Sequence, residues 1–397
     1  MITVEQATRI ILQNALDFNE ETIPLHRAAG RILRENLAAD RDFPPFDRVS
    51  MDGIAIAFEA FAAGQRVFPV EGMQAAGTPH KALTQKSNCL EVMTGAVLPA
   101  HTDTVIRYED IEMNDGKAVI LIEEISKRQN IHGQGTDRRM GDVIVPAGRK
   151  ISPAEIGIAA TIGKSSLRVA GLPKIAVIST GDELIEVEEQ PLPHQIRKSN
   201  VHTLAAVLSG WGIEASLLHL QDDPAEIGEV LGDCLQKFDA LILSGGVSMG
   251  KFDHVPAVLE QLGVQQLFHK ISQRPGKPFW FGKGERTVVF AFPGNPVSSF
   301  LCMFRYFQPW LRAGGRLPPV ETRSATLEED FFFKPDLTYF LQVKLSYRDG
   351  GIFAKPIAGQ GSGDLANLVE TDAFLELPKE RQVFQKGEVF PVWIFRY

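Results

Sequence analysis

The sequence predicts a multidomain α/β protein in which a central, doubly wound and mostly parallel sheet is flanked by two β-rich regions. The chain has 397 residues, which is too long for one compact unit at roughly 100–200 residues per domain. From residue 173 onward, apolar runs of strand length alternate with helical patterns, which favours a parallel sheet covered on both faces. Before and after that stretch, short β-like runs are separated by Gly and Pro.

The first expected element is a helix opened by a capping box at Thr3-Val4-Glu5-Gln6. Its apolar residues fall on one face at helical spacing, namely Val4, Ala7, Ile10, Ile11 and Ala15. A second apolar pattern around 25–37 continues this N-terminal helical region until Phe43-Pro44-Pro45-Phe46 breaks it. From about 44 to 140 the texture is β-rich, and Asn114-Asp115-Gly116 is a hairpin signal.

The α/β stretch is expected to contain strands near 174–179, 213–220, 239–243, 279–282 and 287–292. Asn200 is expected to cap one helix, Asp223-Pro224 to start another, and an apolar helix to run to about 313. The last 80 or so residues return to β character, with a hairpin turn at Arg348-Asp349-Gly350-Gly351. A small β barrel or sandwich is the expected form of that end.

Composition excludes several classes of function. The net charge is −8, from 41 basic and 49 acidic residues, and no basic run occurs, so nucleic acid is not an expected partner. Cys89, Cys234 and Cys302 are far apart, which argues against a disulfide framework and a metal or redox motif. No signal peptide and no 18-residue apolar run is seen, so the expected location is the cytoplasm, with no membrane partner.

Ligands of open α/β sheets bind beyond the carboxyl ends of the strands, so three loops are the first candidates for a site. The first is Thr180-Gly181-Asp182-Glu183. The second begins Ser244-Gly245-Gly246 and continues through Ser248 and Gly250 to Asp253, and its glycines suit a phosphate as well as a plain turn. The third is Pro293-Gly294-Asn295-Pro296, where a helix start with free amides favours an anion.

Charged residues gather near these loops. Lys270, Arg274 and Lys277 lie within eight residues, in a stretch that is either an anion site or a solvated charged loop. Carboxylates fall at strand ends or in the loops that follow them, namely Asp182, Glu183, Asp222, Asp223 and Asp253. Carboxylates beside phosphates are the usual setting of Mg²⁺, and converging charges of both signs suit phosphoryl or nucleotidyl chemistry.

Two motifs resemble catalytic signatures and are rejected. Gly246-Val247-Ser248-Met249-Gly250 fits a hydrolase nucleophile elbow, but the elbow runs directly into a helix, whereas here the loop continues to Asp253. Gly163-Lys164-Ser165 ends like a P-loop, but Ile158 stands where the first glycine should be and no strand precedes it.

Taken in order, these motifs resemble the MoeA-type molybdopterin molybdenumtransferases, including the matching domain of gephyrin-like proteins, over nearly the whole chain. The early landmarks are Pro45-Phe46-Asp47, Ser50-Met51-Asp52-Gly53, Met93-Thr94-Gly95-Ala96, Gly135-Thr136-Asp137 and Gly141-Asp142. The later ones are Ser179 to Leu184, Ser199-Asn200, Ser244 to Gly250, Arg274-Pro275-Gly276-Lys277-Pro278 and Pro293 to Ser298. Each motif is weak alone and specific in this order.

The resemblance implies a subunit of four domains. These are a discontinuous N-terminal linker domain (1–39 plus 142–171), a β-rich inserted domain (40–141), an α/β molybdopterin- and nucleotide-binding domain (172–318) and a C-terminal β-barrel domain (319–397). It also implies a homodimer whose active site lies between subunits. An upstream adenylyltransferase and the recipient molybdoenzymes are further implied partners.

The implied reaction joins adenylylated molybdopterin and molybdate, with Mg²⁺ assisting cleavage of the pyrophosphate and release of AMP. Metal binding falls to Glu183, Asp222 and Asp253, and catalysis to these three with Asp182, Lys270, Arg274 and Lys277. Substrate contacts within one subunit fall to Thr180, Gly181, Gly245, Gly246, Ser248, Gly250, Pro293, Gly294, Asn295, Pro296 and Ser362. Those reaching across from the partner subunit are Asp52, Thr94 and Asp137.

Three positions depart from the family pattern. Ile54 stands where the family has Tyr after Asp-Gly, and Arg274 replaces a Lys while keeping the charge. Leu341 or Gln342 stands where the family commonly has an Arg that contacts molybdate. Two alternatives stay open beside the molybdenum-insertion enzyme: a pterin adenylyltransferase, and a weakened paralogue that binds the pterin or cofactor as a carrier or scaffold.

Overall fold

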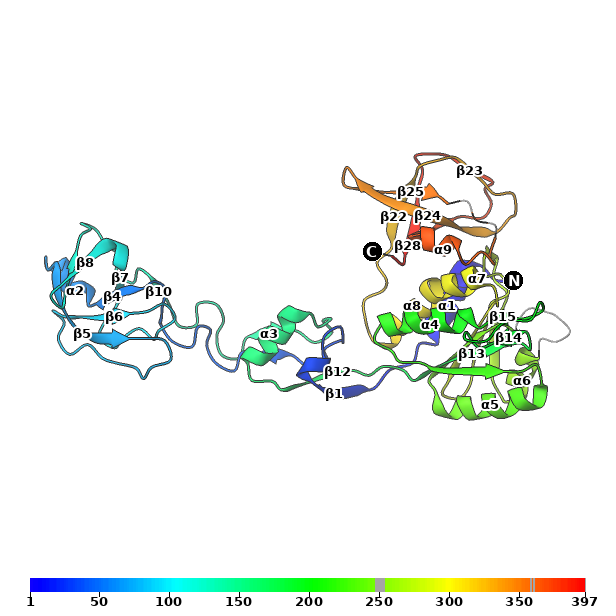
Figure 1. Cartoon of the computed structure of the whole chain (residues 1–397), viewed down its shortest axis with the longest axis horizontal. Helices are drawn as coiled ribbons and strands as arrows, with labels where there is room; N and C mark the ends of the chain where they lie inside the picture. The colour runs from blue at the N-terminus through cyan, green and yellow to red at the C-terminus, as the bar shows by residue number, and fades with distance from the viewer. Residues whose placement is uncertain (247–253, 358, 360, 397) are drawn as a thin grey trace. The chain divides into compact units, whose positions relative to one another are not determined.

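The computed structural model describes residues 1–246, 254–357, 359 and 361–396, which form two compact units. Unit 1 contains residues 1–21 and 170–397, and unit 2 contains residues 22–169 (Figure 1). No helix in the described part of the chain is long and apolar enough to cross a membrane. The four-domain division given above stays a prediction.

Unit 1 is organised around a six-stranded sheet that is parallel in its first four strands and antiparallel at one edge. In spatial order the strands are β16 (Ser216–Leu220), β13 (Ile175–Thr180), β17 (Ala240–Ser244), β21 (Val288–Phe292), β20 (Trp280–Lys283) and β18 (Gln265–His269). Every residue of β13, β17 and β21 is buried, as expected for central strands covered on both faces. The predicted mostly parallel sheet is confirmed.

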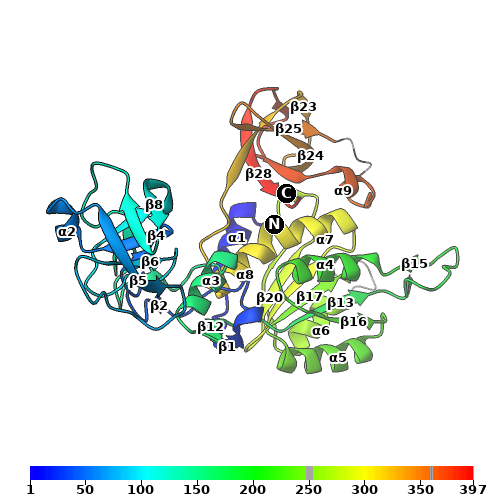
Figure 2. The ribbon, with the colours of Figure 1, turned by 60° about the vertical axis from the view of Figure 1, so that its left-hand side comes forward.

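Two layers of helices cover this sheet. One face carries α4 (Ser199–Gly210), α7 (Pro296–Cys302), the π-helical segment η3 (Met303–Phe307) and α8 (Gln308–Gly314), and the other carries α5 (Pro224–Lys237) and α6 (Val255–Gln261) (Figure 2). Successive side chains of β13 point to opposite faces of the sheet, because Val177 packs in the core with α4, α7 and α8, and Ile178 packs in the core with α5 and α6. The sheet is therefore doubly wound.

Helix α1 (Val4–Gln13) belongs to unit 1, and its capping box at Thr3 and Gln6 is confirmed. Buried Val4, Ala7 and Ile11 join the core beside α8. The buried Arg305 of η3 donates to Thr8 Oγ1 of this helix (2.9 Å) and pairs with Glu376 of the C-terminal region (3.1 Å). Elements from both ends of the chain thus complete one core.

The C-terminal region is a small closed barrel, which confirms one of its two predicted forms. Its strands are β22 (Arg323–Leu327), β24 (Thr338–Arg348), β25 (Gly351–Pro356), β26 (Ala373–Leu377) and β28 (Val389–Ile394). The order β24-β25-β22-β28-β26 closes because β26 also pairs with β24. The predicted hairpin turn joins β24 to β25, with positive φ at Asp349 and Gly350. Around it lie β19 (Gln273–Arg274), α9 (Asn367–Glu370), and the pair β23 (Phe331–Phe332) and β27 (Val383–Phe384).

Unit 2 contains the predicted β-rich region. Its six-stranded sheet runs β7 (Thr104–Arg107), β4 (Gly53–Ile56), β6 (Cys89–Val92), β5 (Val67–Gln74), β9 (Lys117–Ile120) and β8 (Ile111–Asn114). The turn at 114–117 forms the predicted hairpin. Also here are α2 (Phe58–Ala62), the 3₁₀ segment η2 (Tyr108–Asp110), and the antiparallel pair β3 (Arg48–Val49) and β10 (Ile131–His132).

The rest of unit 2 differs from the helical region expected near the N-terminus. The described structure has one α-helix there, α3 (Pro153–Thr161), together with the pairs β1 (Glu20–Pro24) with β12 (Ser166–Ala170) and β2 (Leu37–Ala38) with β11 (Val143–Val145). The apolar pattern at 25–37 forms the short 3₁₀ segment η1 (Leu25–Arg27) and extended chain instead of a helix. Its apolar residues pack against α3 and β12, which explains the pattern without helical periodicity.

Candidate functional site

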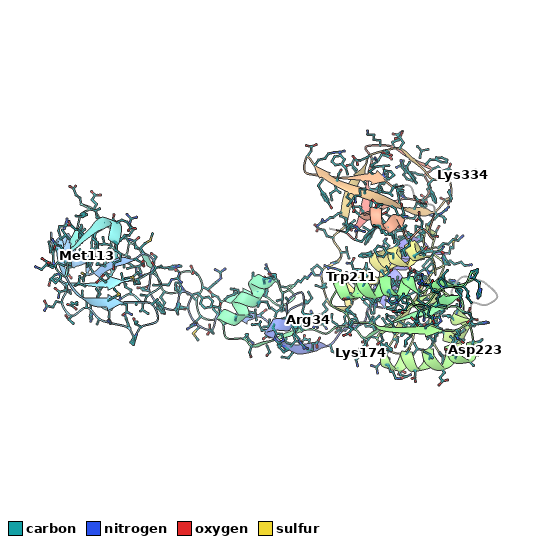
Figure 3. All side chains as sticks on the ribbon, viewed as in Figure 1. Arg34, Met113, Lys174, Trp211, Asp223 and Lys334 are labelled. Atoms are coloured by element: carbon teal, nitrogen blue, oxygen red, sulfur yellow. The ribbon has the colours of Figure 1, made fainter. Side chains whose placement is uncertain are left out.

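The carboxyl edge of the parallel sheet brings together residues from separate predicted loops. In the register of β13 and β16, Thr180 lies opposite Leu220, so the loops that follow start side by side. The Asp222 amide donates to Asp182 Oδ1 at 2.9 Å. Asp223 accepts from the Ala225 amide at 2.8 Å and caps α5, as predicted, which gives it a structural task (Figure 3).

Glu183 folds back over the first loop. A Cβ built on Gly181 would lie 2.4 Å from Glu183 Oε2, and Gly181 has a φ of +130°. The positive φ favours glycine at this position, whereas the carboxylate is the flexible end of its side chain. The Glu183 side chain itself is exposed at the sheet edge, which leaves its oxygens accessible to a ligand.

The glycine-rich loop after β17 lies against Thr180. A Cβ on Gly245 would be 2.9 Å from Thr180 Oγ1, and one on Gly246 would be 2.8 Å from the same atom. Thr180 is 4% exposed, and its hydroxyl has no hydrogen-bond partner among the described residues. Such a close backbone approach suits the predicted phosphate cradle. The predictions for Ser248, Gly250 and Asp253 fall on residues 247–253, outside the described residues.

These loops border a cavity of about 520 Å³, which we call the strand-end cleft. Five of the predicted site residues line this cleft, namely Thr180, Glu183, Gly245, Gly294 and Pro296. The segment between β14 (Leu184–Ile185) and β15 (Ile196–Arg197) projects from the sheet and supplies part of its wall (Figure 2). A cavity of this size at a sheet's carboxyl edge is a typical place for a nucleotide-sized ligand.

Asn200 is not the helix cap that the sequence predicts. Helix α4 begins at Ser199 with Lys198 as its N-cap, and Asn200 lies within the first turn. Its side-chain Nδ2 donates to Ser244 Oγ at 2.9 Å and to the Gly294 carbonyl at 2.6 Å. Local propensity assigns this side chain to a helix cap, but it makes tertiary hydrogen bonds at the ends of two strands instead.

Lys198 is a cleft residue that sequence reasoning missed. It is 8% exposed, and its ammonium pairs with Glu186, whose pKa this hydrogen bond lowers. Burial, and then the charge of Lys198, lowers the pKa of His219 on β16. No sequence signal exposes this cluster, because β14 and β15 are only two residues long each.

The start of α7 is organised as predicted, but most of its contacts are internal. Asn295 is the N-cap and Pro296 the first helical residue. Instead of capping, Asn295 Nδ2 donates to Ser362 Oγ at 2.7 Å, and the Val297 amide donates to the Ser362 carbonyl at 3.1 Å. The loop that contains Ser362 thus accepts from the Val297 amide, which was expected to be free for an anion. Pro293, which precedes the start of α7, is buried.

Ser362 also lines a second cavity of about 340 Å³, the barrel cleft. Arg274 of β19 lies opposite Tyr339 of β24 in register, and both line it together with Gln342, Gly359 and Gly361. Lys270 and Lys277 flank Arg274 on the same hairpin, where Lys270 has a φ of +72° and Lys277 is exposed. The predicted run of three cations therefore brings one guanidinium to the cleft wall.

The structure separates the two residues left open for the family's arginine position. Leu341 is 2% exposed and packs inside the barrel, whereas Gln342 faces the barrel cleft. Gln342 Oε1 accepts from Asn367 Nδ2 at 3.1 Å, while the Thr371 hydroxyl, 3.3 Å away, donates its single hydrogen to the nearer Asn367 carbonyl at 2.7 Å. The Asn367 bond fixes the acceptor end, so the Nε2 donor end faces Gly359 on the cleft wall.

In unit 2, Asp52 and Thr94 form one exposed group. Asp52 Oδ1 accepts from both the amide and the hydroxyl of Thr94, each at 2.7 Å. The amide bond first, and then the hydroxyl bond, hold the pKa of Asp52 below its usual value. The carboxylate is thus kept charged and fixed on the surface.

Asp137 has a different local partner. His132 Nε2 contacts Asp137 Oδ1 at 2.9 Å, and Arg48 Nη2 contacts His132 Nδ1 at 3.0 Å. Since a guanidinium only donates, His132 Nδ1 accepts and Nε2 carries the hydrogen. Ile54, where the family has an aromatic residue, is fully buried in the core of the β-rich sheet and has no surface for a ligand.

The described residues hold no cluster of three metal-ligating side chains. Of the predicted Mg²⁺ ligands, Glu183 and Asp222 lie in loops that leave neighbouring strands, and Asp253 is outside the described residues. One or two carboxylates with phosphate oxygens are enough for Mg²⁺ in proteins, so these two oxygen donors fit such an ion.

Comparison with protein families covers most of the chain. Residues 2–163 match the MoeA N-terminal region (domain I and II), residues 176–313 match a probable molybdopterin binding domain, and residues 324–395 match the MoeA C-terminal region (domain IV). A molybdopterin molybdenumtransferase of Synechocystis is 41% identical, covering 99% of this chain and 100% of the relative.

More distant relatives agree. A molybdopterin molybdenumtransferase of Haemophilus influenzae is 30% identical and covers 100% of this chain and 99% of its own length. Among solved structures, a molybdopterin biosynthesis MoeA protein of Pyrococcus horikoshii superposes with a TM-score of 0.86 at 28% identity, covering 100% of both chains.

Proposed function

This chain belongs to the MoeA family of molybdopterin molybdenumtransferases, and from that premise we propose that it inserts molybdate into adenylylated molybdopterin and releases AMP. The observation that carries the proposal is that two clefts share one wall. Gly361 and Ser362 line the barrel cleft, and Gly363 and Leu365 line the strand-end cleft. A substrate that carries a nucleotide and also receives an oxyanion needs two such neighbouring compartments.

The strand-end cleft is proposed to hold the nucleotide side of the substrate. Thr180, Gly245 and Gly246 form a tightly packed edge where the glycines carry no side chains and which a phosphate can therefore approach closely, although the Gly245 amide itself donates to the Phe292 carbonyl. Gly181, Asp182 and Gly294 shape the same edge, with Asp182 holding the Asp222 amide. Ser248 and Gly250 are proposed to extend this cradle.

The barrel cleft is proposed to hold molybdate and the terminal phosphate. The Arg274 guanidinium, the Gln342 amide and the Ser362 hydroxyl surround it, with Lys270 and Lys277 raising the positive potential nearby. The Asn295 side chain and the Val297 amide hold Ser362, and with it the common wall, in place, while Pro296 begins the helix between them. Because Gln342 is neutral, oxyanion binding here depends more on Arg274 than it would beside a second guanidinium.

Mg²⁺ is proposed to be held by Glu183, Asp222 and Asp253 together with phosphate oxygens. The ion would supply charge neutralisation for the diphosphate as AMP departs. Asp52, Thr94 and Asp137 are proposed to complete the site from the partner subunit of a homodimer. The fixed, charged state of Asp52 is what a group that orients a substrate from a distance requires.

The test is AMP release from adenylylated molybdopterin, measured with Mg²⁺ and with or without molybdate. Molybdate-dependent release with formation of active cofactor is expected. Arg274→Ala is expected to abolish the molybdate dependence, while Lys334→Ala, which removes an exposed barrel cation, keeps it (Figure 3). Binding of the pterin nucleotide without release of AMP would contradict the proposed enzyme activity and support a carrier. The neutral Gln342 in the barrel cleft would be consistent with that carrier.

A further inference from the structure

Asn200 occupies an unusual position in the strand-end cleft. Its single amide nitrogen donates to Ser244 Oγ at the end of β17 (2.9 Å) and to the Gly294 carbonyl after β21 (2.6 Å). These acceptors belong to the two loops that border the cleft on this side. The side chain is therefore held at two points.

The orientation of the Asn200 amide follows from one of these partners. A carbonyl oxygen can only accept, so the atom that meets the Gly294 carbonyl is the nitrogen. An amide nitrogen has two hydrogens, and both are used by the two contacts. Asn200 thus has no hydrogen left to donate to a ligand.

The oxygen end of the same amide is available. Asn200 Oδ1 makes no hydrogen bond within the described part of the chain. It is also not among the described buried atoms left without a partner, which are Arg34 Nε, Thr180 Oγ1 and Ser346 Oγ. Because Asn200 lines the cleft, its Oδ1 is an accessible acceptor there.

Ser244 offers the complementary group. Its Oγ accepts from Asn200, and its hydroxyl hydrogen has no acceptor among the described residues. Ser244 also lines the cleft, so an acceptor and a donor stand next to each other. Leu184, Ile196 and Leu365 add apolar surface to the same cleft, which suits the face of a flat ring.

We propose that this pair recognises the amino edge of a heteroaromatic ring, with Asn200 Oδ1 accepting from the exocyclic amine and Ser244 donating to the adjacent ring nitrogen. The inference deepens the proposed function and rests on it. Both rings of an adenylylated pterin, the adenine and the pterin, carry such an edge. The ring and its amine, not the phosphate chain, would therefore meet Asn200.

The experiment measures binding of matched ligand pairs to the full chain by calorimetry. AMP is compared with inosine monophosphate, and a pterin with the corresponding lumazine. In each second ligand an oxo group replaces the amine, so an acceptor would face Asn200 Oδ1. One pair is expected to differ by about tenfold or more, and that pair identifies which ring occupies the cleft.

Variants test whether Asn200 itself reads the ring. Asn200→Ala is expected to bring the affinity ratio of the discriminating pair close to one, whereas a merely structural role would weaken both ligands equally and keep the ratio. His202→Ala, which removes an exposed side chain from the same turn of α4, is expected to keep the ratio. The comparison in the unaltered protein stands even if Asn200→Ala fails to fold.

Equal affinities within both pairs would overturn the inference while leaving molybdate-dependent AMP release, and thus the proposed function, intact. A ratio that persists in Asn200→Ala would also overturn it. If none of the ligands binds and no AMP is released, the proposed function fails and the inference falls with it.

Discussion

The two units place their predicted site residues in different ways. In unit 1, Thr180 ends one fully buried strand, Gly245 directly follows a second and Gly294 comes two residues after a third. A Cβ on Gly245 would lie 3.0 Å from the Thr180 carbonyl oxygen, and one on Gly294 would lie 3.6 Å from Gly245 Cα, so the three loops are closely packed. In unit 2, Asp52 and Thr94 are exposed and are fixed by two short hydrogen bonds within a single pair. The first site is placed by the core, and the second by a local contact.

From this comparison we expect stability and the proposed activity to be coupled in one region and separable in the other. A substitution in the strand-end cleft disturbs the residues of the buried strands that pack beneath it. A change to the exposed pair in unit 2 alters a charge and little else, because few atoms pack on it.

The largest effect is expected for Gly245→Ala. The residue has a φ of +103°, and a Cβ would lie 2.9 Å from Thr180 Oγ1 and 3.0 Å from the Thr180 carbonyl oxygen. We expect a loss of about 1–3 kcal/mol in the free energy of unfolding. We also expect AMP release to slow about a hundredfold or more as the cradle shifts. Denaturant unfolding and AMP release measure the two effects.

Gly263→Ala is the matched control for that variant. Gly263 has a φ of +81° but nothing within 4 Å of its Cβ position, so the strain is present without the collision. It should cost stability and leave AMP release unchanged. Full activity in Gly245→Ala would remove the cradle from the mechanism.

The next effect concerns the exposed pair. Asp52→Asn is expected to slow AMP release about tenfold, since a charged hydrogen-bonding group is lost, with no measurable change in unfolding. Thr94→Val removes the hydroxyl donor and raises the pKa of Asp52, so the acid limb of the pH–rate profile should move to higher pH. An unfolding transition that shifts with Asp52→Asn would contradict the separation drawn above.

A smaller effect is expected in the barrel cleft. Gln342→Arg restores a guanidinium beside Arg274 and should lower the molybdate concentration at half-maximal rate by about threefold to tenfold. Gln342→Glu should raise it, because the carboxylate repels the oxyanion. If the concentration dependence is the same in all three proteins, position 342 does not contact molybdate.

The smallest effect is a dependence of stability on pH. Burial, and then Lys198, lowers the folded-state pKa of His219 below its unfolded value, so the unfolded chain binds the proton more readily. The stability that this neutral histidine contributes is present above about pH 6.5 and is lost as the pH falls below that value. His219→Gln should flatten the fall in melting temperature between about pH 7 and pH 5. An unchanged slope would assign that fall to other groups.

Much of the fold followed from local sequence. Buried strands, the Thr3 capping box, the helix start at Asp223-Pro224 and the two hairpin turns depend on neighbouring residues, and all are present. The strand ends were predictable for the same reason. Residues 25–37 show the limit, because apolar residues that pack on α3 and β12 mimic a helical pattern.

The parts of the site that could not be predicted depend on contacts between distant segments. Asn200 is hydrogen-bonded to Ser244, which is 44 positions later in the sequence, and to Gly294, which is 94 positions later. Only the assembled sheet brings these residues together and so determines the role of Asn200. Leu341 and Gln342 are adjacent, and the pairing of β24 with β26 decides which one faces inward. The wall between the two clefts joins Asn295 to Ser362, 67 residues later.

The contact of Arg305 with helix α1 and with the barrel has a consequence for how the protein is made. Thr8 and Arg305 are separated by 297 positions, and Trp310 reaches the Asn14 carbonyl across 296. Helix α1 therefore leaves the ribosome long before Arg305 and Trp310 do. Unit 2 is one continuous segment between them and can fold in the interval, whereas the core of unit 1 can close around α1 only after Arg305 and Trp310 have been made.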